Sequence, residues 1–153
     1  DAFTTTTYTV TVTRRTPYED WIAANSLTGP NSAADEDFDG DGASNFMEFA
    51  LNTDPRVPSA ALLPIVTTTV NPSDNEHYPT ITYRRRITPG TLTYVIRSSP
   101  NLGTWTDVPG SQLEQIGPAD PVGDETTETV TFRILPSLED APSRRFLRLK
   151  ISN

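Results

Sequence analysis

One stretch of the chain concentrates side chains that can bind a hard cation. The sequence "DFDGDGASNFME", from Asp37 to Glu48, has aspartate at alternate positions 37, 39 and 41 and ends on a glutamate. Carboxylates this close together repel one another unless a cation lies among their oxygens. The stretch is therefore either a solvated acidic loop or the cradle of a metal ion.

The order of the residues matches the spacing of calcium loops. Ca²⁺ takes about six to eight oxygen ligands, and a twelve-residue loop supplies them from positions 1, 3, 5, 7, 9 and 12, with a glycine for the sharp turn at position 6. Gly42 occupies that sixth position. Mg²⁺ fits less well, because it demands octahedral geometry and keeps several waters. We predict a Ca²⁺ site with these ligands: Asp37, Asp39, Asp41, the carbonyl of Ala43, Asn45 and Glu48.

Short helices are expected on both sides of this loop. Thr16 as N-cap, Pro17 at the first helical position and Glu19 as the partner in a capping box start a helix that must end before Gly29 and Pro30. After the loop, "NFMEFALN" predicts a second helix that ends before Pro55 and buries its apolar residues: Phe46, Met47, Phe49, Ala50 and Leu51. A bound ion would clamp the two helices, so its role is expected to be structural.

From about Ala60 onward the sequence changes to short runs rich in β-branched and aromatic residues. Pro, Gly, Asn and Asp separate these runs, which is typical of strands and turns in an antiparallel β-sandwich. The fold class predicted is mainly β, a sandwich preceded by a helix–calcium loop–helix segment. The predicted strands lie in "LPIVTTTV", "YPTITYRRR", "LTYVIRSS", "TWTDVPG", "QLEQIG", "ETVTFRILP" and "RRFLRLKIS".

The N-terminal stretch "FTTTTYTVTVTRR" predicts one more, extended strand. Tyr8, Val10 and Val12 alternate with threonines, the pattern of a strand with one buried face. No partner strand lies nearby in the sequence. The strand therefore folds back on its own sandwich, pairs with a neighbouring subunit by β-strand addition, or is ordered by crystal contacts or another partner. The predicted organisation is an extended strand over 1–15, a calcium-binding segment over 16–58 and a β-sandwich over 59–153.

Composition excludes several classes of partner. The 153 residues carry a formal net charge of -8, which argues against nucleic acid and against an anionic membrane surface. No apolar run reaches the roughly 20 residues that span a bilayer. The chain has no cysteine, so it has neither disulfides nor thiolate metal sites. Its start at Asp1 predicts a processed product or an excised fragment, from which a signal peptide could have been removed. We expect an extracellular or cell-surface location.

Residues for catalysis are hard to assemble from this sequence. The only histidine, His77, lies in the polar stretch "NPSDNEHYPT", and there is no cysteine, no G-x-S-x-G motif and no glycine-rich phosphate loop. A carboxylate pair for glycoside hydrolysis, brought together from distant loops, stays open. The sequence predicts no enzyme.

The loop resembles those of EF-hands, dockerins and thrombospondin type 3 repeats, which also read D-x-D-x-D-G. Dockerins carry two such loops and this chain has one. A longer likeness runs through "YEDWIAANSL", "DFDGDGASNFMEFALNTDP", "LTYVIRSSPNLGTW" and "RRFLRLKIS". It resembles the C-terminal module of large secreted bacterial proteins, in which a calcium-loop helix pair precedes a β-sandwich. "YTVTVTR" is similar to the last strand of the cadherin-like β-sandwich domains that often come before that module. The resemblance implies a non-enzymatic module.

Two functions remain as hypotheses. The first is a calcium-stabilised extracellular building block of a surface fibre or cell-surface assembly, joined by exchange of the N-terminal strand between subunits. The alternative is a C-terminal carbohydrate-binding, adhesion or sorting module of a larger secreted protein. For carbohydrate, Trp105 in "NLGTWTDVPG" is near a turn, where an exposed ring would stack on a sugar, although a core position at strand spacing is the other interpretation.

Overall fold

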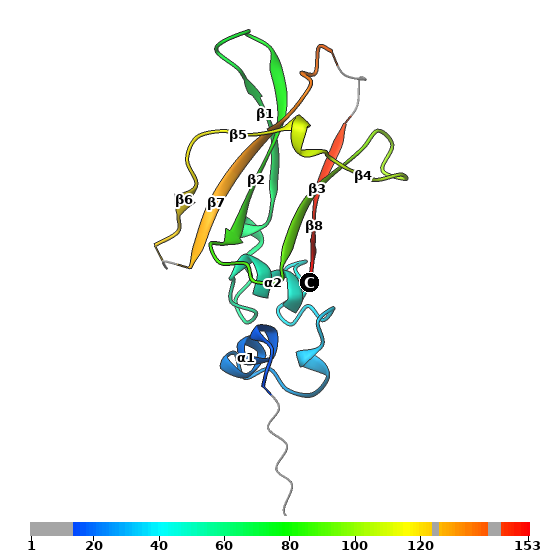
Figure 1. The fold of residues 1–153 in the computed structure, drawn as a ribbon. Helices are drawn as coiled ribbons and strands as arrows, with labels where there is room; N and C mark the ends of the chain where they lie inside the picture. The colour runs from blue at the N-terminus through cyan, green and yellow to red at the C-terminus, as the bar shows by residue number, and fades with distance from the viewer. Residues whose placement is uncertain (1–13, 124–125, 141–144) are drawn as a thin grey trace, which may run out of the picture.

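A computed structural model describes residues 14–123, 126–140 and 145–153 of the chain (Figure 1). It is mainly β, with two antiparallel sheets and two α-helices in the described part. Residues 1–13, which hold most of the strand predicted over 1–15, lie outside the described residues. No helix in the described ranges is long and apolar enough to cross a membrane.

The first helix, α1 (Pro17–Ala24), starts as the sequence predicts. Thr16 accepts a hydrogen bond from the Glu19 amide, and the Glu19 side chain accepts from the Thr16 amide, so the capping box is confirmed. The second helix is α2 (Asn45–Leu51), and it begins inside the predicted metal loop. Three 3₁₀ turns complete the helical elements: η1 (Gly29–Ser32), η2 (Ala60–Leu62) and η3 (Gly110–Gln112).

Two details of the predicted helix–loop–helix differ in the structure. Helix α1 does not lead into the loop, because residues 25–36, which include η1, separate Ala24 from Asp37. In α2, Phe46 and Met47 are half-buried instead of buried, whereas the polar Asn45 and Glu48 are fully buried. The apolar pattern misassigned this face because an amide and a carboxylate take the buried positions beside the loop.

The larger sheet has five strands in the order β1-β2-β7-β5, with β6 also paired to β7. Its strands are β1 (Ile65–Val70), β2 (His77–Arg86), β5 (Leu113–Gln115), β6 (Asp120–Pro121) and β7 (Thr127–Ile134). The smaller sheet has the order β4-β3-β8, from β3 (Thr93–Ser99), β4 (Thr106–Asp107) and β8 (Phe146–Ser152). Each of the seven predicted strand stretches after residue 60 contains a strand, and only the two-residue β6 was not predicted.

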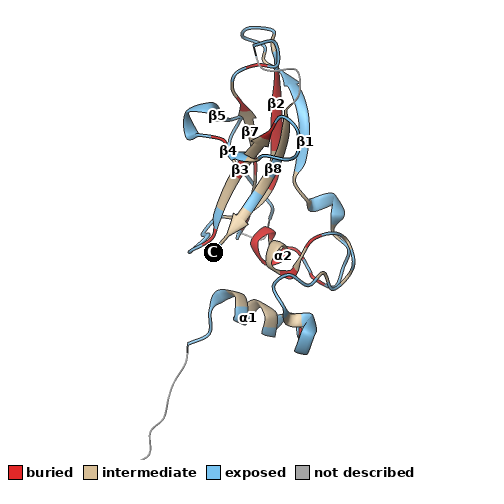
Figure 2. Ribbon diagram, turned by 90° about the vertical axis from the view of Figure 1, so that its right-hand side faces the viewer, coloured by how far each residue is buried: buried red, intermediate tan, exposed pale blue. Residues whose placement is uncertain are grey.

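The core lies between the two sheets, in a sandwich-like arrangement. Ile81 and Tyr83 from β2, Val130 and Ile134 from β7 and Ile96 from β3 are buried in one cluster. Figure 2 shows this buried interior along β2 and β7, with a second buried region at α2. Burial of these side chains is the main force that holds the sheets together.

Helix α2 packs against the end of the sheets where β2 ends and β3 begins. Phe49 and Ala50 form a buried cluster with Leu92, and the aromatic rings of α1 pack on its outer side. The Arg86 Nε donates to the carbonyl of Phe49 at 2.8 Å, and the Tyr94 hydroxyl donates to the carbonyl of Ala50 at 2.7 Å. The loop that α2 ends is thereby held at one end of the β structure (Figure 1).

Candidate metal centre

The loop from Asp37 to Glu48 folds around the carboxylate of Asp37. Asp37 Oδ1 accepts from the amides of Gly40 at 2.8 Å and Asp41 at 3.2 Å, and Oδ2 accepts from the amide of Gly42 at 2.9 Å. Gly42 has φ +95°, a conformation that side chains with a Cβ rarely adopt, so the glycine predicted for the sixth position makes the turn.

The three aspartates converge. One carboxylate oxygen from each of Asp37, Asp39 and Asp41 lies within 4.8 Å of the other two, and all three residues are half-buried. Burial raises the pKa of Asp39, and the negative charges of Asp41 and Asp37 raise it further. Asp39 Oδ1 accepts from the Asp41 amide at 3.2 Å, while Oδ2 is buried with no hydrogen-bond partner among the described residues.

Asp41 connects the loop to the segment that leads into β1. Its Oδ1 accepts from the Ala43 amide at 2.8 Å, and its Oδ2 accepts from the Ser59 amide at 2.5 Å and the Ser59 hydroxyl at 3.1 Å. Burial by itself would raise the pKa of Asp41, but these hydrogen bonds outweigh it and lower the pKa. Asp41 therefore stays ionised and is fixed in orientation.

Glu48, the last residue of the loop, is the most unusual group in the site. Its relative exposure is 0%, and neither carboxylate oxygen has a hydrogen-bond partner among the described residues. Burial, followed by the charges of Asp39, Asp41, Asp37 and Asp54, raises the pKa of Glu48 from 4.5 to about 7. Its oxygens are not part of the 4.8 Å group of aspartates, but they are close enough for all of these charges to raise its pKa.

Asn45 is held with its amide oxygen unpaired. Its Nδ2 donates to the carbonyls of Asn31 at 2.9 Å and Ala33 at 2.8 Å, while its Oδ1 is buried with no partner in the described ranges. The Asn45 backbone amide also donates to the Glu36 carbonyl at 2.7 Å. These contacts explain why Asn45 is fully buried at the start of α2: it ties the helix to η1 and leaves an oxygen free for another group.

All six predicted ligand residues belong to this one loop, and the structure groups the three aspartates directly. Asn45, Glu48 and Asp39 each bury at least one oxygen that no described donor satisfies, and Ala43 is completely buried between them in sequence. Buried polar atoms without partners are rare in proteins, because each loses its hydration without compensation. The arrangement can coordinate a cation of the oxygen-preferring kind.

Ser59 was missed by the reasoning from sequence. It is 18 positions from Asp41, and nothing in the sequence around this serine indicates such a contact. Thr53, which follows α2, also buries a hydroxyl oxygen with no described partner. No motif in the sequence connects either residue to the loop.

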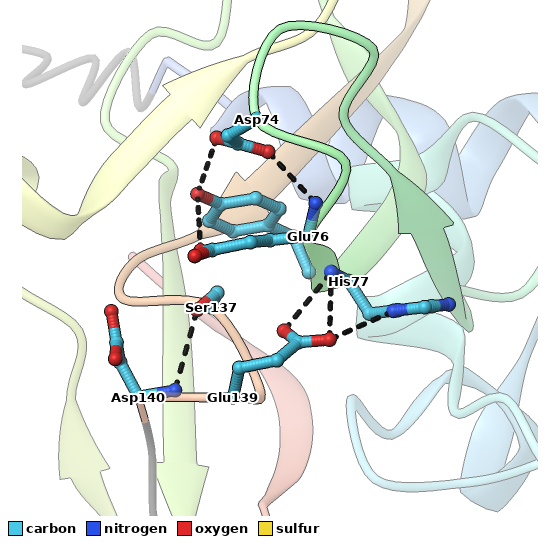
Figure 3. A network of polar contacts seen from close by, with 7 residues as sticks. Asp74, Glu76, His77, Ser137, Glu139 and Asp140 are labelled. Atoms are coloured by element: carbon cyan, nitrogen blue, oxygen red, sulfur yellow. Dashed lines mark hydrogen bonds and ion pairs between the residues drawn. The ribbon is translucent and has the colours of Figure 1, made fainter.

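A second polar network lies at the other end of the sheets, around the only histidine. His77 Nδ1 contacts Glu139 Oε1 at 2.8 Å, and its backbone amide donates to the same carboxylate (Figure 3). Ser137 Oγ accepts from the Asp140 amide and takes no part in a contact with the imidazole among those shown (Figure 3). His77 and Glu139 are both exposed, and this geometry joins the β1–β2 hairpin to the β7–β8 connection without forming a nucleophile–base pair.

Trp105 is half-buried in the structure. The guanidinium of Arg148 lies 4.2 Å from the centre of its ring, and its indole nitrogen donates to the Leu102 carbonyl at 3.0 Å. A cation over one face of the ring occupies the surface on which a sugar would stack. The contact does not favour a carbohydrate site at this residue.

Comparisons of the chain with protein-family models, with curated proteins and with solved structures found no match.

Proposed function

We propose that this chain is a non-enzymatic, calcium-stabilised structural module of an extracellular or cell-surface assembly. The observation that carries the proposal is Glu48, a completely buried carboxylate whose two oxygens lack hydrogen-bond partners among the described residues. Every charge that shifts its pKa is a carboxylate. A divalent cation among these oxygens would convert the repulsion into attraction.

The energetic argument distinguishes an ion site from a solvated acidic loop. A solvated loop keeps its carboxylates in water, where close charges cost about 1 kcal/mol at 4 Å. Here the carboxylate of Glu48 and one oxygen of Asp39 are removed from water. Burying an ionised carboxylate without a counter-charge costs several kcal/mol, which a bound cation offsets.

The contacts of the loop indicate what the ion would stabilise. Asp41 reaches Ser59 ahead of β1, and Asn45 reaches the carbonyls of η1. An ion that fixes the loop therefore also fixes the junction between the helical end and the sheets. Such a role is structural and requires no chemistry at the ion.

For the role in an assembly, the support is the alternating N-terminal stretch that includes Tyr8, Val10 and Val12. A strand of this type offers backbone groups for β-strand addition to a neighbouring copy. In a head-to-tail arrangement, each copy donates one strand and accepts one, which produces a fibre.

The metal part is tested by unfolding the full chain in urea with EDTA or with calcium. At about 100 times the dissociation constant, calcium should add about 2.7 kcal/mol to the free energy of unfolding. Asp37→Ala and Glu48→Ala should abolish this gain, whereas Asp20→Ala, a change of the same charge on α1, should leave it intact. Equal unfolding curves for wild type in EDTA and in calcium would refute the site.

The assembly part is tested by light scattering and negative-stain microscopy of the full chain with calcium. We expect end-to-end oligomers of the wild-type chain. They should become shorter in Val10→Asp, whereas in Thr9→Asp they should keep their length and only be less abundant. A full-length protein that stays monomeric at every concentration would contradict the assembly role while leaving the calcium result untouched.

A further inference from the structure

One face of β1 points toward the interior of the sandwich but is left largely uncovered by the described residues. Val66 is the direct partner of Ile81, and Val70 is the direct partner of His77, so both valines lie on the face of the sheet that carries the buried Ile81. Yet Val66 is 47% exposed and Val70 is 49% exposed, whereas Ile81 is 0% exposed. The buried core therefore includes the inner face of β2 but not that of β1.

The reason is the unequal width of the two sheets. The larger sheet has five strands and the smaller one has three, with β8 at its edge on the side of β1. A hollow of about 280 Å³ lies between these edges, lined mainly by apolar side chains. The residues around it include Met47, Leu63, Val66, Ile81, Leu147 and Leu149. We call this hollow, together with the β1 and β8 edges, the seam.

The edge of β8 that faces the seam pairs with no strand among the described residues. β8 pairs with β3 on its other side through all seven of its residues. Its seam edge therefore presents backbone donors and acceptors over the length of the strand. One further strand beside β8 would widen the smaller sheet and cover Val66 and Val70.

We propose that the missing strand is residues 6–13 of a second copy of this chain, added antiparallel to β8. The proposal rests on the proposed function, since it names the acceptor for the strand exchange between subunits. Addition to the edge of β1 instead would leave the interior face of Val66 and Val70 uncovered. Addition to β8 buries that face, and the hydrophobic effect favours the arrangement that removes more apolar area from water.

The sequence of this segment suits the seam. Residues 2–13 carry no charged side chain, and Tyr8, Val10 and Val12 alternate with threonines. In an added strand, the apolar residues would face the hollow and the threonines would join the outer face of the smaller sheet. Eight residues extend about 26 Å, which matches the seven residues of β8.

Strand direction separates a second copy from the chain's own segment. Figure 1 shows α1, which follows this segment after Thr16, at the same end of the molecule as the end of β8. If a chain filled its own seam, residue 13 would lie beside the last residues of β8, and the strand would run parallel to it. All described pairings are antiparallel, and antiparallel pairs are somewhat more stable per residue.

A segment from a second copy can enter from the opposite end and run antiparallel. Its residues Arg14 and Arg15 would then reach the end of the sheets that carries the network of Figure 3. Asp74, Glu139 and Asp140 are exposed at that end of the sheets. The charges of donor and acceptor are therefore complementary at the entrance of the seam.

Disulfide cross-linking tests the acceptor edge and the direction, because the natural chain has no cysteine. Donor copies carry Thr13→Cys or Thr7→Cys, and acceptor copies carry Phe146→Cys or Ser152→Cys on the outer face of β8. Donors and acceptors are mixed in calcium, oxidised mildly and analysed on non-reducing gels, with each variant oxidised alone as the background. Control acceptors carry Thr69→Cys on β1 or Gln115→Cys on β5.

We expect Thr13→Cys to link at least about tenfold more to Phe146→Cys than to Ser152→Cys, and Thr7→Cys to show the reverse preference. Links that prefer Thr69→Cys or Gln115→Cys would overturn the proposed acceptor, and so would the opposite pairing along β8. A chain that carries both Thr13→Cys and Ser152→Cys and closes a disulfide within itself at high dilution would also overturn it. Light scattering of the same samples separates the two proposals: oligomers without β8 links refute only the seam, whereas the absence of oligomers refutes the assembly as well.

Discussion

The loop from Asp37 to Glu48 and the seam both leave groups without partners among the described residues, but the groups differ. In the loop, polar atoms of Asp39, Asn45 and Glu48 are buried and no described residue donates to or accepts from them. In the seam, the apolar side chains of Val66 and Val70 face the interior and stay about half exposed in the described part of the chain. A cation would satisfy the polar atoms of the loop, and an apolar surface would cover the valines of the seam. The two proposals therefore start from different kinds of atom.

The two regions also meet. Gly42 and Met47, from the loop and from α2, line the hollow of the seam together with residues of β1 and β8. Fixing the loop with an ion would also fix one wall of the seam. Substitutions in the loop and substitutions in the seam should nevertheless have separable effects.

The largest effect is expected from pH on the calcium-free protein. The pKa of Glu48 is about 7 in the folded chain and 4.5 in the unfolded one, so between these values the folded state holds more protons. The free energy of unfolding should then fall as the pH rises from about 4.5 to about 7, by on the order of 3 kcal/mol. Urea unfolding in EDTA at several pH values measures this slope. It should disappear in saturating calcium, because the ion replaces the proton.

Glu48→Gln should have opposite effects with and without calcium. In EDTA above pH 7 the variant should be more stable than wild type, because glutamine has a similar shape to glutamate but places no charge in the buried site. In calcium at about 100 times the dissociation constant it should lack the gain of about 2.7 kcal/mol. Asp35→Asn, an exposed change of the same charge close to the loop, should behave like wild type. A Glu48→Gln variant that still gains stability from calcium would remove Glu48 from the site.

Val66→Asp tests the seam without touching the loop. Because Val66 is 47% exposed, the folded monomer should lose less than about 1 kcal/mol. Association between copies should weaken by about tenfold or more, because a charge would enter an apolar contact. Val57→Asp, at a valine that is 56% exposed outside the seam, is the matched control. Sedimentation measures the association, and equal effects of the two changes would argue against the seam as an interface.

Ser59→Ala should have the smallest effect. It removes the hydroxyl contact to Asp41 at 3.1 Å and leaves the backbone amide contact in place. We expect a loss of about 1 kcal/mol and a calcium affinity only a few-fold weaker. Ser73→Ala, in the exposed β1–β2 turn, should change neither quantity. Urea unfolding and a calcium titration are the two measurements, and an unchanged Ser59→Ala would mean that the Ser59 hydroxyl plays no part in orienting Asp41.

The sequence predicted much of the loop because its contacts are local. Asp37 bonds to amides three to five residues ahead, and Gly42 makes the turn at the position that its place in the motif requires. The capping box of α1 and the strands after residue 60 follow from equally local patterns. Interactions between near neighbours require particular residue types at a fixed spacing, so the sequence alone predicts them.

Only the tertiary structure decided which groups are left without partners. The complete burial of Glu48 depends on how α2 packs, and the contact of Asp41 with Ser59 depends on how the chain returns from α2 to β1. The exposed valines of β1 depend on a smaller sheet that ends at β8. Alternation predicts that a strand has a face to bury, but burial is a property of the space between strands far apart in the chain, and no spacing along the sequence records it.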